Sequence, residues 1–532
     1  MVRRALLLAA LMAFTLAGCG GGSGSHTPKV LRVAIGSEPI SLDPPLATDS
    51  IALNVILNTG DPLVALDHDA EAVPSLAQSW DWSPNGKTIT FHLRKDGRWT
   101  NGDQVTAHDF EWSWKRLLSP EIGSFYAYFL YGVVGGRAYN ECTEACARLR
   151  EKVGIAALDD FTLQVRLTSP QPWFPEQLAH GVFVAVHRAT VERFGKAWPE
   201  PKNIVTNGPF KLRAWTHDKS IVLVKNATWR DAKRVSLDRV VLPVIGDPAA
   251  LTRAFRRGAI DATLGDAPVP AEDVQPLTSS GDLATYSVLA NFYYGFNLAN
   301  VPDINQRRAM AFAIDRGEFV RRTDSRNLPG TGFIPPGMPG FDLITQDFLS
   351  PEPDLGKARA FMRRVPHPKL KITLYLNDLP DVVRSGEIAK EAWAKLGITT
   401  RTRVLEWAQY LEALGPPPRK DMDVARLGWI GDFTDAYNFF QLLGCRSDGN
   451  YWNFCDPAYD ELLRRASQVE EERDRYRIYA RLEARLTGPD GLLPVIPILW
   501  GEIASLEKPS VRGTFNINPL AYVDFAAVRP KT

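Results

Sequence analysis

The stretch Arg426-Leu-Gly-Trp-Ile-Gly-Asp432-Phe-Thr-Asp-Ala-Tyr-Asn-Phe-Phe440 holds an acid in unusual surroundings. Asp432 follows a Gly-Trp step and lies in a segment that is otherwise rich in apolar and aromatic residues. A carboxylate in such a place is costly unless a cation meets it, because burial removes its hydration. The stretch therefore indicates a site for a positively charged group. The alternative is a surface-loop acid, or a helix N-cap ahead of Asn438.

Length and composition limit the possible classes of protein. At 532 residues the chain is too long for one core, so two or three domains are expected. The net charge is +1, and acids and bases are mixed throughout. No basic patch or run of Lys and Arg predicts nucleic-acid binding. Strands mixed with helices along the whole length favour an α/β fold.

The N-terminus predicts export and a lipid anchor. A basic start, Met1–Arg4, precedes an apolar run of residues 5–16, and a membrane span needs about twenty residues. Leu16-Ala-Gly-Cys19 follows and is typical of a lipobox, so residues 1–19 are expected to form a lipoprotein signal peptide with Cys19 lipidated. Residues 20–27 form a flexible Gly/Ser tether. A plain secretory signal with an incidental Cys is the alternative. We expect a protein of the periplasm or cell envelope, and the choice of membrane stays open.

The other four cysteines form two close pairs in the sequence, Cys142 with Cys146 and Cys445 with Cys455. In an exported protein the pairs predict two local disulfides. A zinc site would need both pairs to converge, and the ten-residue spacing of the second pair is unlike a zinc knuckle. We therefore expect no metal and no other cofactor.

Local patterns predict several elements. Alternating, β-branched runs predict strands, and apolar residues at helical spacing predict helices. Thr106 is the expected N-cap of one helix, with Asp109 in the position of a capping-box acid. The expected strands are 31–35, 88–94, 161–167 and 221–224, and the expected helices are 105–118, 305–315, 382–396 and 457–486.

Five segments, in order, resemble the bacterial extracellular solute-binding proteins of family 5, the periplasmic peptide receptors of ABC importers. Each segment is weak evidence alone, but the five in order behind a lipobox are specific. They are Ser37–Pro44, Trp99–Phe110, Asn203–Leu212, Tyr294–Arg316 and the stretch quoted first.

The resemblance implies a two-lobe periplasmic binding protein fold of α/β class (type II, large peptide-binding class), with an extra domain inserted in the first lobe. Lobe I would comprise residues 28–51, 190–290 and 501–532. The inserted domain would cover 52–189, and lobe II would cover 291–500. Such lobes close around a ligand by a hinge motion.

The resemblance also implies a binding site. Asp432 would hold the free amino group of a peptide. Trp407, Trp429 and Tyr126 would line the cleft with aromatic surface, with core packing as the alternative. The strand with Arg426 and Gly428 would pair with the peptide main chain. Arg426 could equally form an ion pair within lobe II. Glu38 would lie at the mouth of the cleft, or else cap a strand end.

Two departures from the family pattern leave details open. Asp435 is followed by Ala436, where relatives often have Asp-Pro. Residues 415–419, Gly-Pro-Pro-Pro-Arg, look like a short insertion. The residue that would fix a peptide C-terminus lies nearby in relatives, so peptide length is open. The candidates for this C-terminal contact are Arg403, Arg419 and Lys420.

A Cys445–Cys455 disulfide would stiffen the rim of the cleft.

The expected function is capture of short peptides, oligopeptides first, for a membrane permease of an ABC importer, by a monomer that contacts the membrane through its anchor only. An enzyme is disfavoured, because no Gly-x-Ser-x-Gly, His-Glu-x-x-His or P-loop motif occurs. Two alternatives keep the fold. One is a receptor for a metal chelate such as a nickel chelate, for haem or for a sugar, and the other is a sensory lipoprotein.

Overall fold

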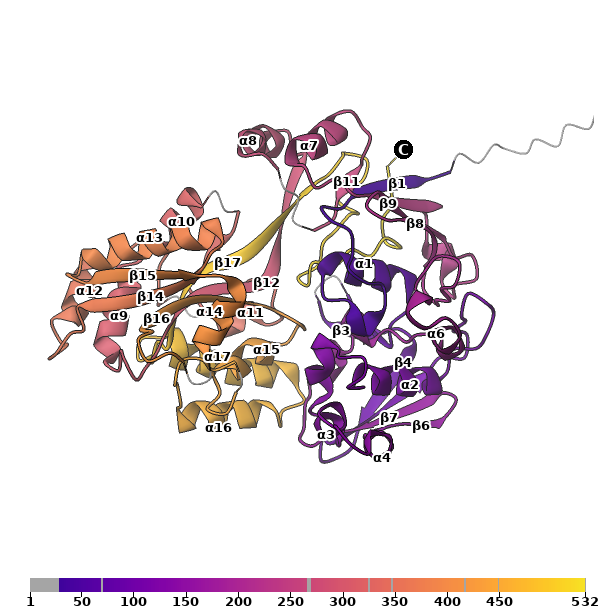
Figure 1. Ribbon diagram of the computed structural model, residues 1–532, viewed down its shortest axis with the longest axis horizontal. Helices are drawn as coiled ribbons and strands as arrows, with labels where there is room; N and C mark the ends of the chain where they lie inside the picture. The colour runs from indigo at the N-terminus through magenta and orange to yellow at the C-terminus, as the bar shows by residue number, and fades with distance from the viewer. Residues whose placement is uncertain are drawn as a thin grey trace, which may run out of the picture.

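The computed structural model describes residues 28–531 except 68–69, 266–268, 324–325, 346–347, 416–417 and 448. The predicted signal peptide, Cys19 and the tether thus lie outside the described residues. Figure 1 shows two bodies joined by two long strands, β12 (Leu283–Phe296) and β17 (Val495–Leu506). The second body is the one that contains the six-stranded sheet, and the first body is the remainder.

The first body contains a five-stranded sheet of order β11-β1-β10-β9-β8. Strand β1 pairs in parallel with β10 and β11, whereas β9 pairs antiparallel with β8 and β10. Leu31 and Val33 of β1 are buried on alternate positions, as the period of two predicts. The bounds are β1 Val30–Ala34, β8 Phe210–Thr216, β9 Ser220–Lys225, β10 Arg239–Pro243 and β11 Ala262–Thr263.

A second, antiparallel sheet of order β4-β5-β7-β6 completes the first body. Helix α2 (Ala107–Leu117) packs on β6 and β7 and begins with the predicted capping box of Thr106 and Asp109. The bounds are β4 Ala77–Trp82, β5 Thr88–Leu93, β6 Ile155–Asp159 and β7 Thr162–Arg166, with a small hairpin of β2 Val64–Leu66 and β3 Ala72–Pro74.

The second body is built on a six-stranded sheet of order β13-β17-β12-β16-β14-β15. β12 pairs antiparallel with both β16 and β17, and its first residue Leu283 still pairs with Leu506 near the first body. The expected lobe boundaries, 290/291 and 500/501, thus fall inside two paired strands. The other bounds are β13 Leu328–Pro329, β14 Lys371–Asn377, β15 Thr399–Leu405 and β16 Val424–Ile430.

Helices cover the sheets and connect the strands. Those of the first body are α1 Ser50–Thr59, α3 Gly136–Asn140, α4 Cys146–Arg150, α5 Phe174–Gln177, α6 Arg188–Phe194, α7 Pro248–Arg256 and α8 Ala271–Ser279. Those of the second are α9 Ile304–Phe312, α10 Arg316–Arg322, α11 Phe341–Ile344, α12 Leu355–Met362, α13 Pro380–Ala394, α14 Trp407–Leu414, α15 Tyr437–Phe440, α16 Pro457–Ala466 and α17 Glu472–Thr487.

The predicted single helix over 457–486 is wrong, because the chain breaks between α16 and α17. The carbonyls of Val469 and Glu470 in the break accept hydrogen bonds from Arg475, at 3.1 and 2.9 Å. A buried guanidinium therefore satisfies the carbonyls that a continuous helix would have paired internally. The other predicted elements form within a few residues of their expected bounds. Both predicted disulfides are present, Cys142–Cys146 and Cys445–Cys455.

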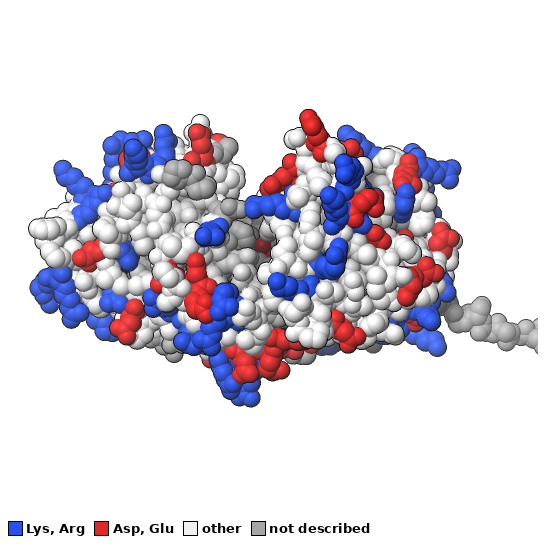
Figure 2. All heavy atoms as spheres, turned by 90° about the horizontal axis from the view of Figure 1, so that it is seen from below, with Lys and Arg blue, Asp and Glu red and all other residues white. Residues whose placement is uncertain are grey.

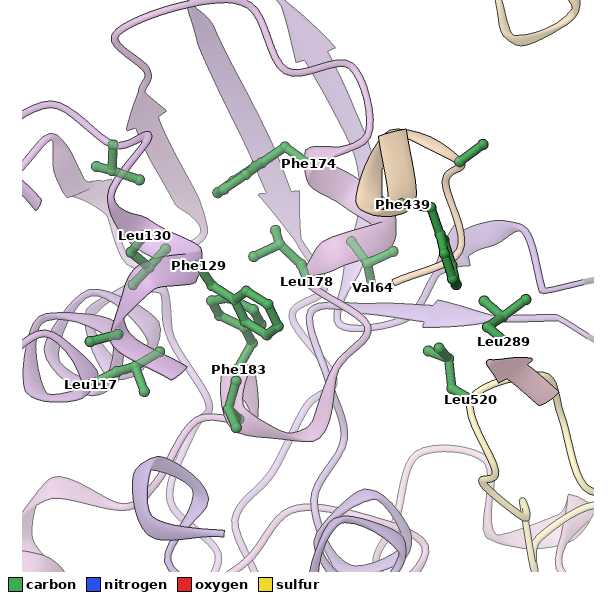
Figure 3. Close-up of a cluster of buried hydrophobic side chains, with 14 of the residues drawn as sticks. Val64, Leu117, Phe129, Leu130, Phe174, Leu178, Phe183, Leu289, Phe439 and Leu520 are labelled. Carbon is green, nitrogen blue, oxygen red and sulfur yellow. The ribbon is translucent and has the colours of Figure 1, made fainter. Parts of the chain in front are cut away.

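One apolar cluster connects the two bodies. Figure 3 shows Leu289, Phe439 and Leu520 close together on one side of the cluster and Phe129 and Phe183 on the other. All of these side chains are buried or nearly so. The bodies are therefore joined by apolar packing as well as by the paired strands.

Candidate functional site

Asp432 lies just beyond the end of β16, where the two bodies meet. Its Oδ2 accepts a hydrogen bond from the hydroxyl of Tyr128, at 3.0 Å, and one from the Asn438 amide, at 3.2 Å. Tyr128 belongs to the first body, in the 3-10 helix η2 (Phe125–Leu130). Among the described residues, no Lys or Arg forms an ion pair with Asp432. The carboxyl group thus accepts hydrogen bonds from both bodies and pairs with no cation in the described part of the chain.

Burial sets the protonation of this carboxyl group. It raises the pKa of Asp432 to about 6, although the hydrogen bonds from Asn438 and Tyr128 act in the opposite direction. The hydrogen bonds therefore replace only part of the lost hydration. A cation at Oδ1 would favour the charged form. A desolvated acid without a counterion is typical of a site that receives a charged group from outside.

Aromatic rings pack beside Tyr128, which is the first-body partner of Asp432. The ring of Tyr126 lies 4.8 Å from the ring of His180 and 5.2 Å from that of Phe129, centroid to centroid. Burial lowers the pKa of His180 to about 3, so this ring is neutral. Burial, together with the charge of Asp432, raises the pKa of Tyr126 to about 12. The predicted wall residue Tyr126 is thus close to Asp432.

Asn438 links two predicted site residues. Its side-chain oxygen accepts hydrogen bonds from the Trp429 indole, at 2.8 Å, and from the Asp432 backbone N–H, at 3.2 Å. The structure therefore brings Trp429 and Asp432 together through a buried amide. Neither Asn438 nor Tyr128 was among the predicted site residues. The available signals were a polar residue before Phe439 and a tyrosine within the aromatic run 125–131.

Gly428 and Arg426 lie on β16 opposite Phe292 and Tyr294. A Cβ atom at Gly428 would come within 2.3 Å of the Phe292 ring, so the protein itself requires a glycine here. The Arg426 guanidinium lies 4.6 Å from the centre of the same ring, and burial lowers the pKa of Arg426. Arg426 forms no ion pair with any described residue, so the ion pair that was its alternative role is absent there. Its Nε also has no hydrogen-bond partner there.

β16 has an open edge along most of its length. On one side it pairs with β12 over the whole of residues 424–430, whereas on the other it pairs with β14 only at Val424 and Ala425. The ladder with β14 therefore ends before residue 426, and the open edge leads toward Asp432. Tyr410 donates a hydrogen bond to the carbonyl of Arg426 at the start of this edge.

The remaining predicted residues, Trp407 and Glu38, contact described residues other than Asp432. Trp407 begins α14, with its ring against Tyr410, and is 48% exposed. Glu38 accepts hydrogen bonds from the Asp218 backbone, at 2.6 Å, and from His217, in the turn between β8 and β9. Glu38 therefore stabilises the turn between β8 and β9, and its place at the mouth of the cleft stays a prediction.

Asp435, where the sequence departs from the family pattern, is a buried structural acid. It accepts hydrogen bonds from Arg475, at 2.9 Å, and from Tyr479, at 2.5 Å. The three candidates for a C-terminal contact do not touch Asp432. Arg403 pairs with Asp421 at 3.2 Å, and Arg419 and Lys420 are exposed. Residues 416 and 417 of the expected insertion lie outside the described residues.

Figure 2 shows a notch between the two bodies. Ile430 of β16 and Phe125 of η2 are 69% and 68% exposed, so apolar surface is bare on both sides of the Tyr128–Asp432 contact. A separate cavity of about 460 Å³ lies within the first body, with Trp229, Arg230 and Asp524 in its wall. None of the predicted site residues lines this cavity.

No group of three or more His, Cys, Asp or Glu side chains among the described residues could hold a metal ion. No helix in the same part of the chain has the length and apolar character needed to cross a membrane.

Comparison with known proteins gives a consistent match. The model for "Bacterial extracellular solute-binding proteins, family 5 Middle" matches residues 71–451. The chain is 29% identical to the oligopeptide-binding protein OppA of Bacillus subtilis, over 96% of this chain and 97% of that one. It is 30% identical to the periplasmic oligopeptide-binding protein OppA of Escherichia coli, over 91% and 89%. The probable deoxycholate-binding periplasmic protein YgiS of Escherichia coli is 29% identical, over 93% and 92%.

Solved structures confirm the predicted two-lobe periplasmic binding protein fold. The unliganded open form of the murein tripeptide binding protein MppA matches with a TM-score of 0.81 and 28% identity, over 94% of this chain and 97% of that one. Haemophilus influenzae OppA in complex with the peptide RPPGFSPFR matches with a TM-score of 0.70 and 26% identity, over 94% and 99%. The higher score with the open form agrees with the notch in Figure 2.

Proposed function

The chain belongs to the bacterial extracellular solute-binding proteins of family 5, and from this premise we propose that it captures short peptides between its two bodies for an ABC importer. The observation that carries the proposal is Asp432, a desolvated carboxyl group with no cation beside it among the described residues. The free amino group of a peptide supplies such a cation. A charge-assisted hydrogen bond of this kind is about twice as strong as a neutral one.

The open edge of β16 supports the same proposal. An extended peptide that pairs with residues 426–430 forms main-chain hydrogen bonds, which give affinity without reading the peptide sequence. Its N-terminus then lies at the end of the strand, beside Asp432. Trp429, Tyr126 and the half-exposed Trp407 offer aromatic surface to its side chains. Arg426 lies at the other end of the open edge as a half-buried cation.

The two strands that connect the bodies would act as a hinge when the cleft closes. We assign the hinge to β12 and β17, where the expected boundaries of lobe I (28–51, 190–290 and 501–532) and lobe II (291–500) fall inside paired strands. The inserted domain, 52–189, contributes Tyr126 and Tyr128 to the site. A closed cleft excludes water, which strengthens the contact between an ammonium group and Asp432.

We also propose where the protein is located. Cys19 carries the lipid, residues 20–27 tether the body, and the protein works in the periplasm or cell envelope as a monomer that serves a permease. The names of the Escherichia coli relatives, which are periplasmic binding proteins, support this location. We assign no catalytic role, since the relatives are named as binding proteins.

A non-peptide ligand is the second candidate, because one relative is named for probable deoxycholate binding. Deoxycholate is a carboxylate at neutral pH. An acid such as Asp432 at the site would repel it, since a like charge in a desolvated place is unfavourable. The charge of Asp432 therefore favours a ligand with a free amino group.

Calorimetry with a matched pair of peptides tests the proposal. One short peptide has a free N-terminus and the other is N-acetylated. We expect the free peptide to bind roughly 100-fold more tightly, because loss of a buried charge partner costs a few kcal/mol. Asp432→Asn should abolish this preference, whereas Asp490→Asn, which removes an exposed acid, should keep it. Equal affinity of the wild-type protein for both peptides would refute the role of Asp432.

A further inference from the structure

A strongly basic surface lies at the end of the second body, around α12. Residues 357–371 contain six Lys or Arg residues, one His and no Asp or Glu, although the whole chain carries a net charge of only +1. Figure 2 shows Lys and Arg side chains gathered at the end where α12 lies in Figure 1. The α12 patch consists of Lys357, Arg359, Arg363, Arg364, Lys369 and Lys371.

The positive charge of the α12 patch is largely free of internal counterions. Lys357 lies 3.4 Å from Asp354, and Lys369 lies 2.6 Å from Asp423. The other four side chains are exposed and form no ion pair with any described residue. Their field therefore extends into solvent, where it attracts an anionic surface.

Aromatic contacts hold part of the α12 patch in place. The guanidinium of Arg364 lies 5.3 Å from the centre of the Phe361 ring, and that of Arg308 lies 5.6 Å from the same ring. Lys357 lies 5.3 Å from the Phe312 ring. Phe361 stacks on Phe312, so these cations rest on one packed aromatic pair. Two charges of the patch, those of Lys357 and Arg364, thus lie on the same aromatic pair.

The loop beside α12 adds apolar contact. Leu370 is 45% exposed and lies between two lysines of the patch, and Pro366 and Pro368 are also exposed. An exposed Leu amid lysines and arginines suits a surface with anionic headgroups above acyl chains. The basic end therefore offers an anionic surface both positive charge and an exposed apolar side chain.

We propose that the α12 patch binds the surface of a membrane that contains anionic phospholipids. The patch lies at one end of the long axis, and β1, which leads to the N-terminus, lies toward the other. A body held at both ends lies along the membrane instead of swinging from its tether. This contact is separate from the peptide site, since none of the proposed site residues belongs to the α12 patch.

Vesicle sedimentation tests the proposal with a soluble chain of residues 20–532, which keeps every described element and lacks Cys19. The vesicles contain phosphatidylcholine alone or phosphatidylcholine mixed with phosphatidylglycerol. We expect binding to the mixed vesicles only. It should weaken as salt rises from about 0.1 M to 1 M, because the Debye length falls from about 10 to 3 Å.

A charge-matched pair of variants locates the contact. The patch variant carries Arg359→Gln, Arg363→Gln, Arg364→Gln and Lys371→Gln. The control carries Arg465→Gln, Arg473→Gln, Arg477→Gln and Arg481→Gln, which removes four exposed charges from α16 and α17. Each Lys or Arg near an anionic surface contributes about 1 kcal/mol, so the patch variant should bind at least roughly 10-fold more weakly than the control. Absence of wild-type binding, or equal affinity of the two variants, would overturn the proposal. Peptide affinity should stay unchanged in both variants, which verifies their folding.

Discussion

At the scale of single residues, the carboxyl group of Asp432 makes the ligand-free protein less stable at neutral pH. Burial raises its pKa to about 6, above the value of about 3.9 for an unfolded chain. The folded protein therefore binds this proton more readily than the unfolded chain. The protonated Asp432 carboxyl group contributes stability that is fully present below about pH 4 and is lost as the pH rises toward 6. The same group that would bind an ammonium thus lowers stability when no ligand is present.

Asp432→Asn should stabilise the ligand-free protein at pH 7 by about 1–3 kcal/mol, since each pKa unit corresponds to 1.36 kcal/mol. Urea unfolding at pH 7 and near pH 4 measures the effect, which should vanish at the lower pH. Asp490→Asn, at an exposed position, should change little. A variant that is less stable than wild type at pH 7 would mean that the carboxylate already has a strong partner.

Peptide affinity should depend on pH through two groups. Protonation of Asp432 weakens binding below about pH 6, by roughly tenfold per pH unit, and loss of the proton from the peptide amino group weakens it above about pH 8. Affinity is therefore expected to peak between these values in titrations followed by intrinsic Trp fluorescence. In Asp432→Asn the acid limb should disappear. An acid limb that persists in this variant would assign the pH dependence to another group.

Residues that a sequence pattern marks by type were easier to predict than residues that act through tertiary contacts. Asp432 stands out because an acid in an apolar stretch is unusual. Tyr128 does not, because its partner Asp432 lies 304 residues away in the sequence. Asn438 was likewise missed, although it lies only six residues from Asp432, because its hydrogen bonds depend on how the chain turns after β16.

At the scale of secondary structure elements, β16 combines a packed side with an open edge. Gly428 faces Phe292 of β12, and a Cβ there would lie within 2.3 Å of the ring. This glycine lies on the strand that was predicted to pair with a peptide main chain. The structure shows that packing against Phe292 alone is sufficient to require it.

Gly428→Ala should therefore lower the free energy of unfolding by about 1–3 kcal/mol through overpacking. Phe292→Leu in the same chain should restore part of the loss, because it shortens the side chain that the new methyl group meets. Urea unfolding of both single variants and the double variant measures the coupling. Unchanged stability combined with lost peptide affinity would show that the glycine serves the ligand instead.

Element type was predictable wherever local chemistry determines it. The alternating strand 88–94 and the capping box at Thr106 need no distant partner, and both form as expected. The helix expected over 457–486 fails because Arg475 binds the carbonyls of the break and also Asp435, which lies 40 residues earlier. A charged helical pattern does not reveal such a buried guanidinium.

At the scale of the whole molecule, the two bodies also meet through α5 and α15. The ring of Trp173 stacks on Tyr437 with centroids 3.6 Å apart. Glu176, on α5, is buried nearby. Burial raises the pKa of Glu176 to about 8, and the negative charge of Asp435 acts in the same direction. The contact between the bodies therefore contains a carboxyl group that is neutral at pH 7. The family resemblance predicts two lobes, but it does not predict this contact.

Glu176 should make the protein less stable as the pH rises. Its folded pKa lies above the unfolded value of about 4.3, so stability falls between about pH 4 and pH 8. Glu176→Gln should flatten this part of the profile and raise the melting temperature at pH 8. Thermal unfolding at pH 5, 7 and 8 compares the variant with wild type. Parallel profiles would show that Glu176 has an ordinary pKa.

Native mass spectrometry of the protein purified from a bacterial periplasm tests the central claim most directly. A receptor that binds through the peptide main chain and amino group accepts many sequences. We therefore predict a ladder of bound masses, each corresponding to a peptide of a few residues and lost on acid unfolding. A single sharp mass of a non-peptide compound would contradict the account, because it would mean that Asp432 meets some other cation in a dedicated site.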